Sequence, residues 1–415
     1  MRKIITSATG IVLIAISLAK LLGYVYRIVL SKLGPEQYGV FSIALAIFGI
    51  VFTISVLGLD QGILRHLPYY KGAPRKQHQY LVSSLVLACI ASIFLAVLLW
   101  FFAPMLAERF KIQELATVLR ILSISIPFAS IGWLLFSVLQ AEKRIFANVS
   151  LRYLGDSVLK VVLTLFLFSF VLSVSMAAWA HALTLIITCV IAFFLVWPSF
   201  SQSSYDFRTP LLYSLPLLFS GFFYLIIRWT DVLMIGYIRG SSEAGIYSVA
   251  LPTAALLLVV QEAVLYLFVP TMTTHIMAEK TQEAKSLVIR SFFTILILSA
   301  PLFLLFIFFP RILLQTFFGE AYILGVIPLV ILAWGYFVSL PFSVFNSTLA
   351  SMKKTPLILA IAAVAAVANI ILNALLIPGY GMIGGAIATT SALLIMAVLR
   401  CGFGLYYLRR LSESY

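Results

Sequence analysis

Two stretches half a chain apart share one pattern, LGPEQYGVFSIAL at Leu33–Leu45 and RGSSEAGIYSVAL at Arg239–Leu251. An internal repeat with a period near half the chain is typical of transporters built from two related halves. We therefore predict two domains, residues 1–200 and 201–415. The identical residues of the two stretches, 206 positions apart, are Gly34 and Gly240, Gly39 and Gly245, Ser42 and Ser248, Ala44 and Ala250, and Leu45 and Leu251.

A second pair of similar segments supports the repeat. The alternative explanation for one such pair is chance similarity between apolar stretches. At an offset of 210, four residues of one segment have identical or similar counterparts in another. These are Ser137, Leu139, Lys143 and Arg144, matched by Ser347, Leu349, Lys353 and Lys354. Two matches at nearly equal offsets favour a duplicated architecture over coincidence.

The composition places the chain in the membrane. Of its 415 residues 63% are apolar and 10% are charged, whereas globular proteins carry about 25% charged residues. The apolar residues occur in continuous runs of about 20, the length of a transmembrane helix. Hydrocarbon offers the backbone no hydrogen bonds, and continuous runs do not fit the alternation of a β-barrel.

We therefore predict an all-α membrane protein with about twelve transmembrane helices. The expected spans are 5–30, 38–59, 80–102, 118–139, 151–171, 175–197, 211–236, 244–269, 287–309, 322–349, 356–377 and 382–406. Each half then holds six spans, an even number, so both halves enter the membrane from the same side. We therefore predict two six-helix bundles related by an axis along the membrane normal, and we expect a substrate site between them.

Lysine and arginine give the orientation, because cytoplasmic connections are enriched in them. Of the 28 such residues, about seventeen lie in one set of alternating connections. The opposite set holds only Lys32, Arg109, Lys111, Arg239 and Arg311. We expect both termini in the cytoplasm, and basic connections that face anionic lipid headgroups of the cytoplasmic membrane. The net charge of +14 then needs no nucleic-acid partner.

Two segments carry a family resemblance. Leu33–Pro68, LGPEQYGVFSIALAIFGIVFTISVLGLDQGILRHLP, resembles the start of the polysaccharide-biosynthesis (O-antigen type) flippases of the multidrug/oligosaccharidyl-lipid/polysaccharide exporter superfamily. Ala368–Thr389, ANIILNALLIPGYGMIGGAIAT, resembles the late signature of that family, with asparagines in a span followed by a short turn. The resemblance covers essentially the whole chain. It implies the family fold and movement of lipid-linked sugars.

The first span departs from the multidrug branch, whose members commonly carry a membrane-embedded carboxylate. Here Lys20, Tyr24 and Arg27 share one helix face at spacings of three or four residues. A charge at a helix centre costs roughly 2.5–3.5 kcal/mol on insertion scales, so we expect this face to line a cationic cavity that binds a phosphate. The alternative for Arg27 is snorkelling to the nearby outer surface.

Three further groups of polar residues lie in predicted spans. Tyr224, Arg228 and Asp231 share a face of the seventh span, where Arg228 and Tyr224 would bind substrate and Asp231 would couple to an ion or pair with Arg228. The other two groups are Arg152, Asp156 and Lys160 at i, i+4 and i+8, and Glu262 alone in the eighth span. The first of these is either a self-neutralising ladder or part of the charged cavity. Glu262 is either a proton or sodium site or the partner of an arginine.

The sequence contains no Walker loop, HExxH or GxSxG motif, so we expect no enzyme activity, cofactor or metal. The best hypothesis is a flippase that moves polyprenyl-(pyro)phosphate-linked oligosaccharide by alternating access. Its partners would be that substrate, membrane lipid and glycan-assembly enzymes. The alternatives are a cation-coupled multidrug or metabolite exporter and a membrane glycan polymerase or ligase. The excess of intramembrane cations favours anionic cargo over the exporter.

The charge distribution predicts the topology directly. A reporter enzyme fused after Tyr415 should be active only when that enzyme works inside the cell, because the basic connections hold both termini there. Activity of a reporter that works only outside would overturn the orientation and the parallel arrangement of the two halves together.

Overall fold

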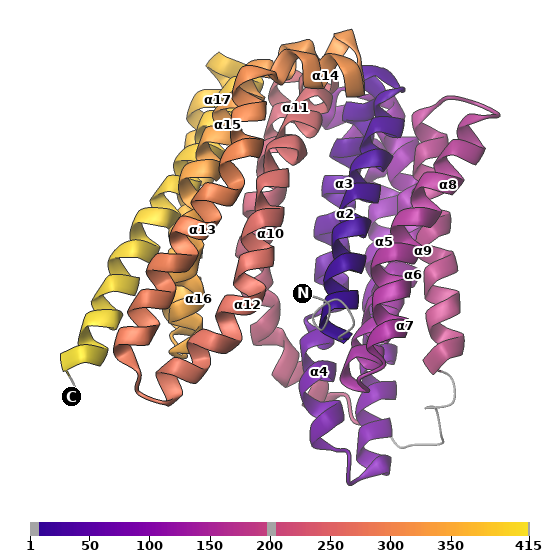
Figure 1. Ribbon diagram of the computed structural model, residues 1–415. Helices are drawn as coiled ribbons and strands as arrows, with labels where there is room; N and C mark the ends of the chain where they lie inside the picture. The colour runs from indigo at the N-terminus through magenta and orange to yellow at the C-terminus, as the bar shows by residue number, and fades with distance from the viewer. Residues whose placement is uncertain (1–7, 197–204, 414–415) are drawn as a thin grey trace. The chain divides into compact units, whose positions relative to one another are not determined.

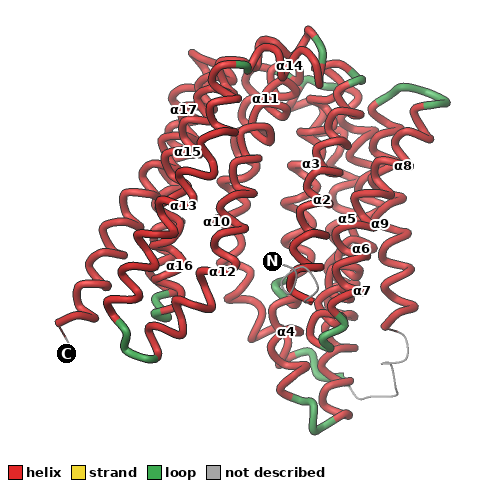
Figure 2. Tube along the Cα trace, in the orientation of Figure 1, coloured by secondary structure: helices red, strands yellow, loops and turns green. Residues whose placement is uncertain are grey.

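The computed structural model describes residues 8–196 and 205–413, and all regular elements among them are helices (Figure 1, Figure 2). They group into two units, residues 1–222 with 240–245 and residues 223–239 with 246–415. We call these unit 1 and unit 2 and describe each by itself.

Unit 1 contains the helices of the first half of the chain and the beginning of α10. In order these are α2 (Ala8–Ser31), α3 (Gly34–Val56), α4 (Leu59–Tyr69), α5 (Pro74–Phe110), α6 (Gln113–Ala141), α7 (Ile145–Val149), the π-helix η1 (Ser150–Gly155), α8 (Asp156–Phe168), α9 (Val174–Val196) and α10 (Arg208–Arg239).

Unit 2 contains the remainder of α10 and the elements that follow it. These are α11 (Ser241–Ala254), η3 (Ala255–Leu257), α12 (Leu258–Met277), α13 (Thr281–Phe308), α14 (Pro310–Phe318), η4 (Glu320–Gly325), α15 (Val326–Ser339), η5 (Leu340–Phe342), α16 (Ser343–Ser351) and α17 (Thr355–Glu413). The first turn of α11 packs with unit 1.

Among the described residues, eight helices or runs of helices are long and apolar enough to cross a membrane. They are Gly34–Tyr69, Pro74–Phe110, Gln113–Ala141, Val174–Val196, Ser241–Met277, Thr281–Phe308, Glu320–Ser351 and Thr355–Arg410. Every one of the twelve predicted ranges overlaps a helix or a run of helices. The all-helical membrane class is therefore confirmed, while the total of twelve spans in two bundles stays a prediction.

The helix ends differ from the expected spans because an apolar run marks only the part of a helix that lies in hydrocarbon. For example, the range 80–102 lies inside α5, whose 37 residues extend over about 55 Å, well beyond the roughly 30 Å hydrocarbon layer. Pro74 begins this helix, where its missing N–H is harmless. The polar turns at the ends of α5 thus project past the apolar layer.

Breaks within the helices fall at special backbone positions. Leu57 and Gly58 have φ of 55° and 69°, which ends α3 and lets α4 start in a new direction. Gly381 has φ 54° and divides α17 into two segments, at the turn expected between the ranges 356–377 and 382–406. Glycine suits this position because it lacks the Cβ that disfavours positive φ.

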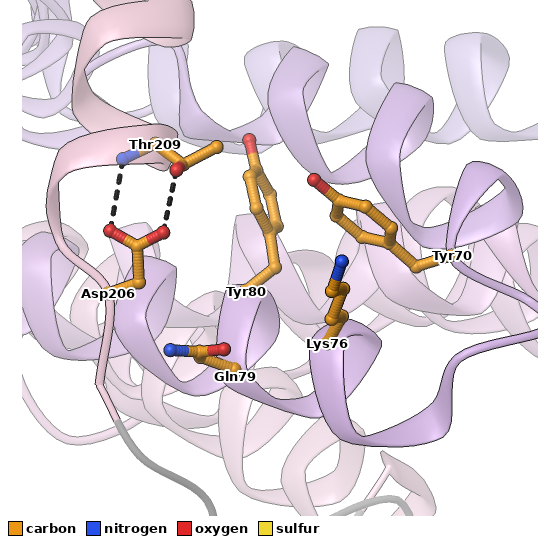
Figure 3. A pocket seen from close by; sticks show the side chains of 6 residues that line it. All are labelled: Tyr70, Lys76, Gln79, Tyr80, Asp206 and Thr209. Atoms are coloured by element: carbon orange, nitrogen blue, oxygen red, sulfur yellow. Dashed lines mark hydrogen bonds between the residues drawn. The ribbon is translucent and has the colours of Figure 1, made fainter.

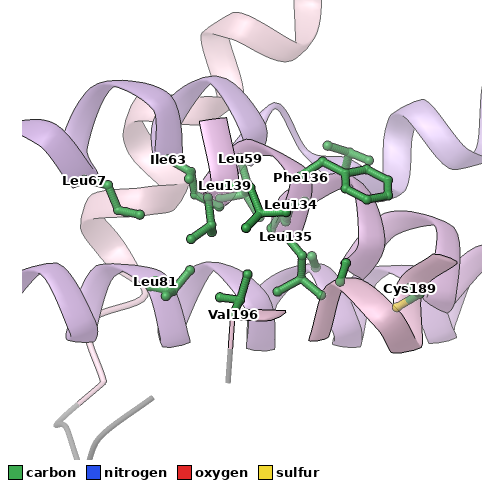
Figure 4. Packing of buried hydrophobic residues seen from close by; sticks show 14 of the residues in the cluster. Leu59, Ile63, Leu67, Leu81, Leu134, Leu135, Phe136, Leu139, Cys189 and Val196 are labelled. Carbon is green, nitrogen blue, oxygen red and sulfur yellow. The ribbon is translucent and has the colours of Figure 1, made fainter. Parts of the chain in front are cut away.

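The core of unit 1 is built around α6, which packs on α3, α4, α5 and α9. Figure 4 shows leucines from α6 meeting apolar side chains from the neighbouring helices. Small residues permit close approach, as where Gly132 of α6 lies against Cys189 of α9. Cys189 is a free thiol buried in this core, in agreement with the apolar context of the sequence around it.

The repeated glycines meet each other within unit 1, where α3 crosses the first turn of α11. A Cβ added at Gly39 would lie 2.9 Å from the backbone nitrogen of Gly245, and a Cβ at Gly245 would lie 2.9 Å from that of Gly39. Each would also collide with a carbonyl oxygen, of Ser241 and Pro35 respectively. Those two residues are themselves 206 positions apart, so the contact is symmetric in the repeat.

Gly39→Val should destabilise the protein by about 3 kcal/mol or more, because the backbone of α11 leaves the new side chain no space. Gly402→Ala is the matched control, since Gly402 is also helical and a Cβ there would meet nothing within 4 Å. It should leave stability unchanged or raise it by up to about 1 kcal/mol. Thermal unfolding in detergent micelles measures both; equal melting of Gly39→Val and the unaltered protein would contradict the close crossing.

Candidate functional site

The most enclosed polar group of the described residues surrounds Asp231 in unit 2. This aspartate on α10 is 1% exposed. Its Oδ2 accepts hydrogen bonds from the hydroxyls of Tyr247, at 2.6 Å, and of Thr389. Its Oδ1 accepts from the side-chain amides of Asn373 at 2.7 Å and Asn369 at 3.3 Å. Four uncharged donors thus occupy the acceptor positions of one carboxylate.

Local structure explains how α17 supplies three of these donors. Asn369 and Asn373 are four residues apart, so both lie on one face of the helix. The break at Gly381 reverses the chain, so that Thr389 returns beside Asn369 and accepts a hydrogen bond from it at 3.2 Å. The returning segment approaches closely at Gly384, where an added Cβ would lie 2.9 Å from the nitrogen of Ile377.

One hydrogen-bond acceptor in this group has no donor among the described residues. The Oδ1 atom of Asn373 is buried and has no hydrogen-bond partner among the described residues, although its amide group donates to Asp231 and to Asn369. A buried acceptor without a donor is unfavourable by about 1–3 kcal/mol. A cation would satisfy it, since hard cations bind carboxylate, amide and hydroxyl oxygens.

The group can also exchange a proton. The hydroxyls of Tyr247 and Thr389 each carry a donor and lone pairs, so either can rotate from donating to accepting. A proton on Oδ2 of Asp231 would then be accepted by the hydroxyl that previously donated to it. The arrangement therefore suits a site that alternates between a charged carboxylate and a neutralised one.

In unit 1 the predicted ladder of charges forms only in part. Lys160 pairs with Asp156 at 2.8 Å, as the spacing predicts. Arg152 instead places its guanidinium 3.9 Å from the centre of the Trp133 ring. Arg152 lies in the π-helix η1. A π-helix has a wider turn than an α-helix, so residues four apart no longer lie on the same face. The predicted alignment of Arg152 with Asp156 on one α-helical face therefore does not apply.

The ring beneath Arg152 is itself held by a carboxylate. Trp133 donates its indole N–H to Oδ2 of Asp60 at 3.3 Å, and the amide of Gln61 donates to the same oxygen at 3.0 Å. The cation, the ring and the carboxylate belong to η1, α6 and α4 respectively, so three helices of unit 1 are joined by polar contacts.

The predicted face of the first span lies on α2. Lys20, Tyr24 and Arg27 are each half-buried. Arg27 donates to the buried hydroxyl of Tyr38 at 3.4 Å, which gives this guanidinium a partner inside the protein. Near Lys20, α2 contacts α8, because the hydroxyl of Ser157 donates to the carbonyl of Ala19 at 3.2 Å.

The remaining predicted residues have different outcomes. Glu262 lies on an exposed position of α12. Tyr224 and Arg228 belong to α10, but their side chains lie outside the described part, so their role in substrate binding and the pairing of Arg228 with Asp231 stay predictions. Sequence reasoning missed Tyr247 and Thr389. The repeat holds a signal for the former, since its counterpart in the first half is a phenylalanine, Phe41.

Comparison with known proteins assigns the family. A family model described as "Polysaccharide biosynthesis protein" matches residues 5–274, well over half of the chain. The chain belongs to this family. A second model, MatE, matches residues 216–375.

Proteins similar to this chain come from archaea and bacteria. An uncharacterized membrane protein of Methanocaldococcus jannaschii is 25% identical over 97% of this chain and 83% of its own. A protein of Shigella flexneri named "Putative O-antigen transporter" is 21% identical over 88% and 89%. A "Probable low-salt glycan biosynthesis flippase Agl15" of Haloferax volcanii is 25% identical over 46% and 40%.

Solved structures show the same fold. An inward-facing multidrug resistance MATE family transporter of the MOP superfamily matches with a TM-score of 0.79, 15% identity and coverage of 97% of this chain and 99% of the other. The lipid II flippase MurJ matches with 0.72, 18% identity and coverage of 94% and 86%. The family member thus has a MATE-like fold.

Removal of the Asp231 carboxylate should show how much its hydrogen bonds contribute to the stability of unit 2. Asp231→Ala leaves four uncharged donors without their acceptor, and because a buried unsatisfied donor costs about 1–3 kcal/mol, stability should fall by about 3 kcal/mol or more. Asp231→Asn should lose less, because the hydroxyls can turn to accept from the new amide. Thermal unfolding tests both, with Glu114→Ala as the control, because Glu114 is an exposed carboxylate in the first turn of α6. A loss for Asp231→Ala no larger than for the control would contradict the network.

Proposed function

We propose that the protein is a flippase for polyprenyl-phosphate- or pyrophosphate-linked oligosaccharide in the cytoplasmic membrane. The observation that carries the proposal is the match to the polysaccharide biosynthesis family over residues 5–274. Two relatives bear names that refer to glycan flipping or O-antigen transport. The headgroup of such a lipid is large, polar and anionic, so it cannot cross hydrocarbon without a protein.

Recognition of the phosphate is assigned to cations within the spans. Lys20 and Arg27 lie half-buried on α2, and Arg228 lies on α10. The tyrosines Tyr24 and Tyr224, one helical turn from them, would add hydroxyl donors. A guanidinium offers a planar fork of donors to phosphate oxygens, and an ammonium offers a point charge. Alternating access would then move the bound headgroup from the cytoplasmic to the outer face.

The Asp231 group is proposed as the site where an ion couples to transport. Binding of a proton or Na⁺ replaces hydrogen bonds that join α10, α11 and the two segments of α17. Loading and release of the ion therefore change how these helices are held together. A ligand shifts a conformational equilibrium only through such a difference in its contacts between two states.

The second candidate is a cation-coupled exporter of drugs or metabolites. It is favoured by the MatE match over residues 216–375, which includes Asp231. The exporter and the flippase differ in cargo but share the coupling site, so transport assays with an anionic lipid and with an organic cation separate them. The third hypothesis, a membrane glycan polymerase or ligase, predicts longer glycans when purified protein and lipid-linked substrate are mixed.

Reconstituted vesicles test the flippase directly. Protein in liposomes that contain a polyprenyl-pyrophosphate-linked oligosaccharide should make the inner-leaflet glycan accessible to a soluble lectin outside. Lys20→Ala should reduce the initial rate about ten- to hundredfold, the value of one charge-assisted hydrogen bond. Lys20→Arg should keep part of the rate, and Lys20→Glu should be slowest because it repels the phosphate.

Lys32→Glu is the control for this series, because Lys32 is an exposed lysine just beyond the end of α2. It introduces the same change of charge outside the proposed site and should leave the rate close to that of the unaltered protein. A well-folded Lys20→Glu variant with full activity would remove Lys20 from the phosphate site. No accessibility above protein-free vesicles would overturn the flippase.

A further inference from the structure

Unit 1 also contains a pocket with polar lining that includes none of the charged residues of α2 and α8. It is a pocket of about 220 Å³ where the turn after α4, the start of α5 and the start of α10 meet. Six residues line it: Tyr70, Lys76, Gln79, Tyr80, Asp206 and Thr209 (Figure 3).

The aromatic wall of this pocket is rigid. Tyr70 follows α4, and Tyr80 lies on α5; their ring centres are 6.2 Å apart. Tyr80 is 3% exposed and stacks on His66 with 4.5 Å between ring centres. His66 in turn meets the edge of Tyr213 at 4.6 Å. Tyr80 is therefore held in place by its neighbours and loses little freedom when a ligand binds.

The opposite wall is the cap of α10. Asp206 accepts hydrogen bonds from the hydroxyl of Thr209 at 2.6 Å and from the backbone N–H groups of Arg208 and Thr209 at 3.1 and 3.3 Å. Its own N–H donates to the hydroxyl of Ser83 at 2.9 Å, which ties the cap to α5. The Thr209 hydroxyl and these N–H groups lower the pKa of Asp206, so the carboxylate is charged at neutral pH.

The combination of lining groups selects one kind of ligand. A phosphate would be repelled by the carboxylate of Asp206, and an organic cation by the ammonium of Lys76. A neutral molecule with many hydroxyls fits both, since it can donate to the carboxylate and accept from the ammonium and the Gln79 amide. The space corresponds to roughly seven water molecules, the scale of a single sugar ring. The partly exposed ring of Tyr70 suits the apolar face of such a sugar ring.

We propose that this pocket binds one sugar residue of the oligosaccharide, on the side of the membrane where α5 and α10 begin. The proposal rests on the flippase function, and it assigns glycan recognition to unit 1 at a place distinct from the cations assigned to the phosphate. By the charge distribution of the connections that side is the cytoplasm, where the lipid-linked glycan would first meet the protein.

Binding is tested with the full chain in lipid nanodiscs and a panel of free glucose, galactose, rhamnose and N-acetylglucosamine, with saturation-transfer NMR as the readout. At least one sugar should give a signal that Tyr70→Ala and Gln79→Ala each reduce at least fivefold. The matched control is Tyr69→Ala, because Tyr69 is adjacent and 80% exposed but does not line the pocket; it should keep the signal. Inorganic phosphate should not displace the sugar.

Several results would overturn the sugar site: no signal from any sugar with the unaltered protein, equal signals from Tyr70→Ala and Tyr69→Ala, or displacement by phosphate, which indicates an anion site instead. The vesicle assay separates this proposal from the proposed function. With an active flippase, Tyr70→Ala and Gln79→Ala should raise the half-saturating concentration of lipid-linked oligosaccharide about five- to tenfold. Unchanged half-saturation in both would refute the sugar site while leaving the flippase intact.

Discussion

Hydrocarbon supplies no hydrogen bonds, so polar atoms within the spans of this chain are stabilised mainly by partners inside the protein. For the backbone that requirement selects helices. For side chains it selects the few places where charges occur. Asp231 has four uncharged donors from α11 and the two segments of α17, and Arg152 lies on an indole ring whose N–H is bound to Asp60. The polar contacts thus join helices at defined positions.

The two units meet this requirement with different chemistry. Unit 2 surrounds a single carboxylate with amides and hydroxyls, groups that can exchange partners without a change of charge. Unit 1 uses cations held by an aromatic ring, a carboxylate or a phenol, as for Arg152, Lys160 and Arg27. In the function that we propose, the first arrangement is the one that binds a coupling ion, and cations of unit 1 such as Arg27 are the ones that bind the anionic headgroup.

Features with a local cause could be predicted from the sequence. Apolar runs predicted the helical ranges, and the turn at Gly381 was expected from the family resemblance of Ala368–Thr389, in which a span is followed by a short turn. The π-helix at 150–155 has no comparable signal, and it is the reason that Arg152 leaves the expected ladder. The roles of Tyr247 and Thr389 were also not predicted. A hydroxyl in an apolar span becomes a partner of Asp231 only when helices distant in sequence pack together.

The mutual contact of Gly39 and Gly245 has the geometry of an interface between identical subunits. In a two-fold dimer, residue i of one copy meets residue j of the other, and j meets i. Here the carbonyl of Ser241 faces Gly39, and the carbonyl of Pro35 faces Gly245. Pro35 and Ser241 are 206 positions apart, as are Gly39 and Gly245. A single copy of this segment could make the same contact with a second copy of itself. Within one chain, Gly39 and Gly245 remain glycine in both stretches because each needs the other to remain small.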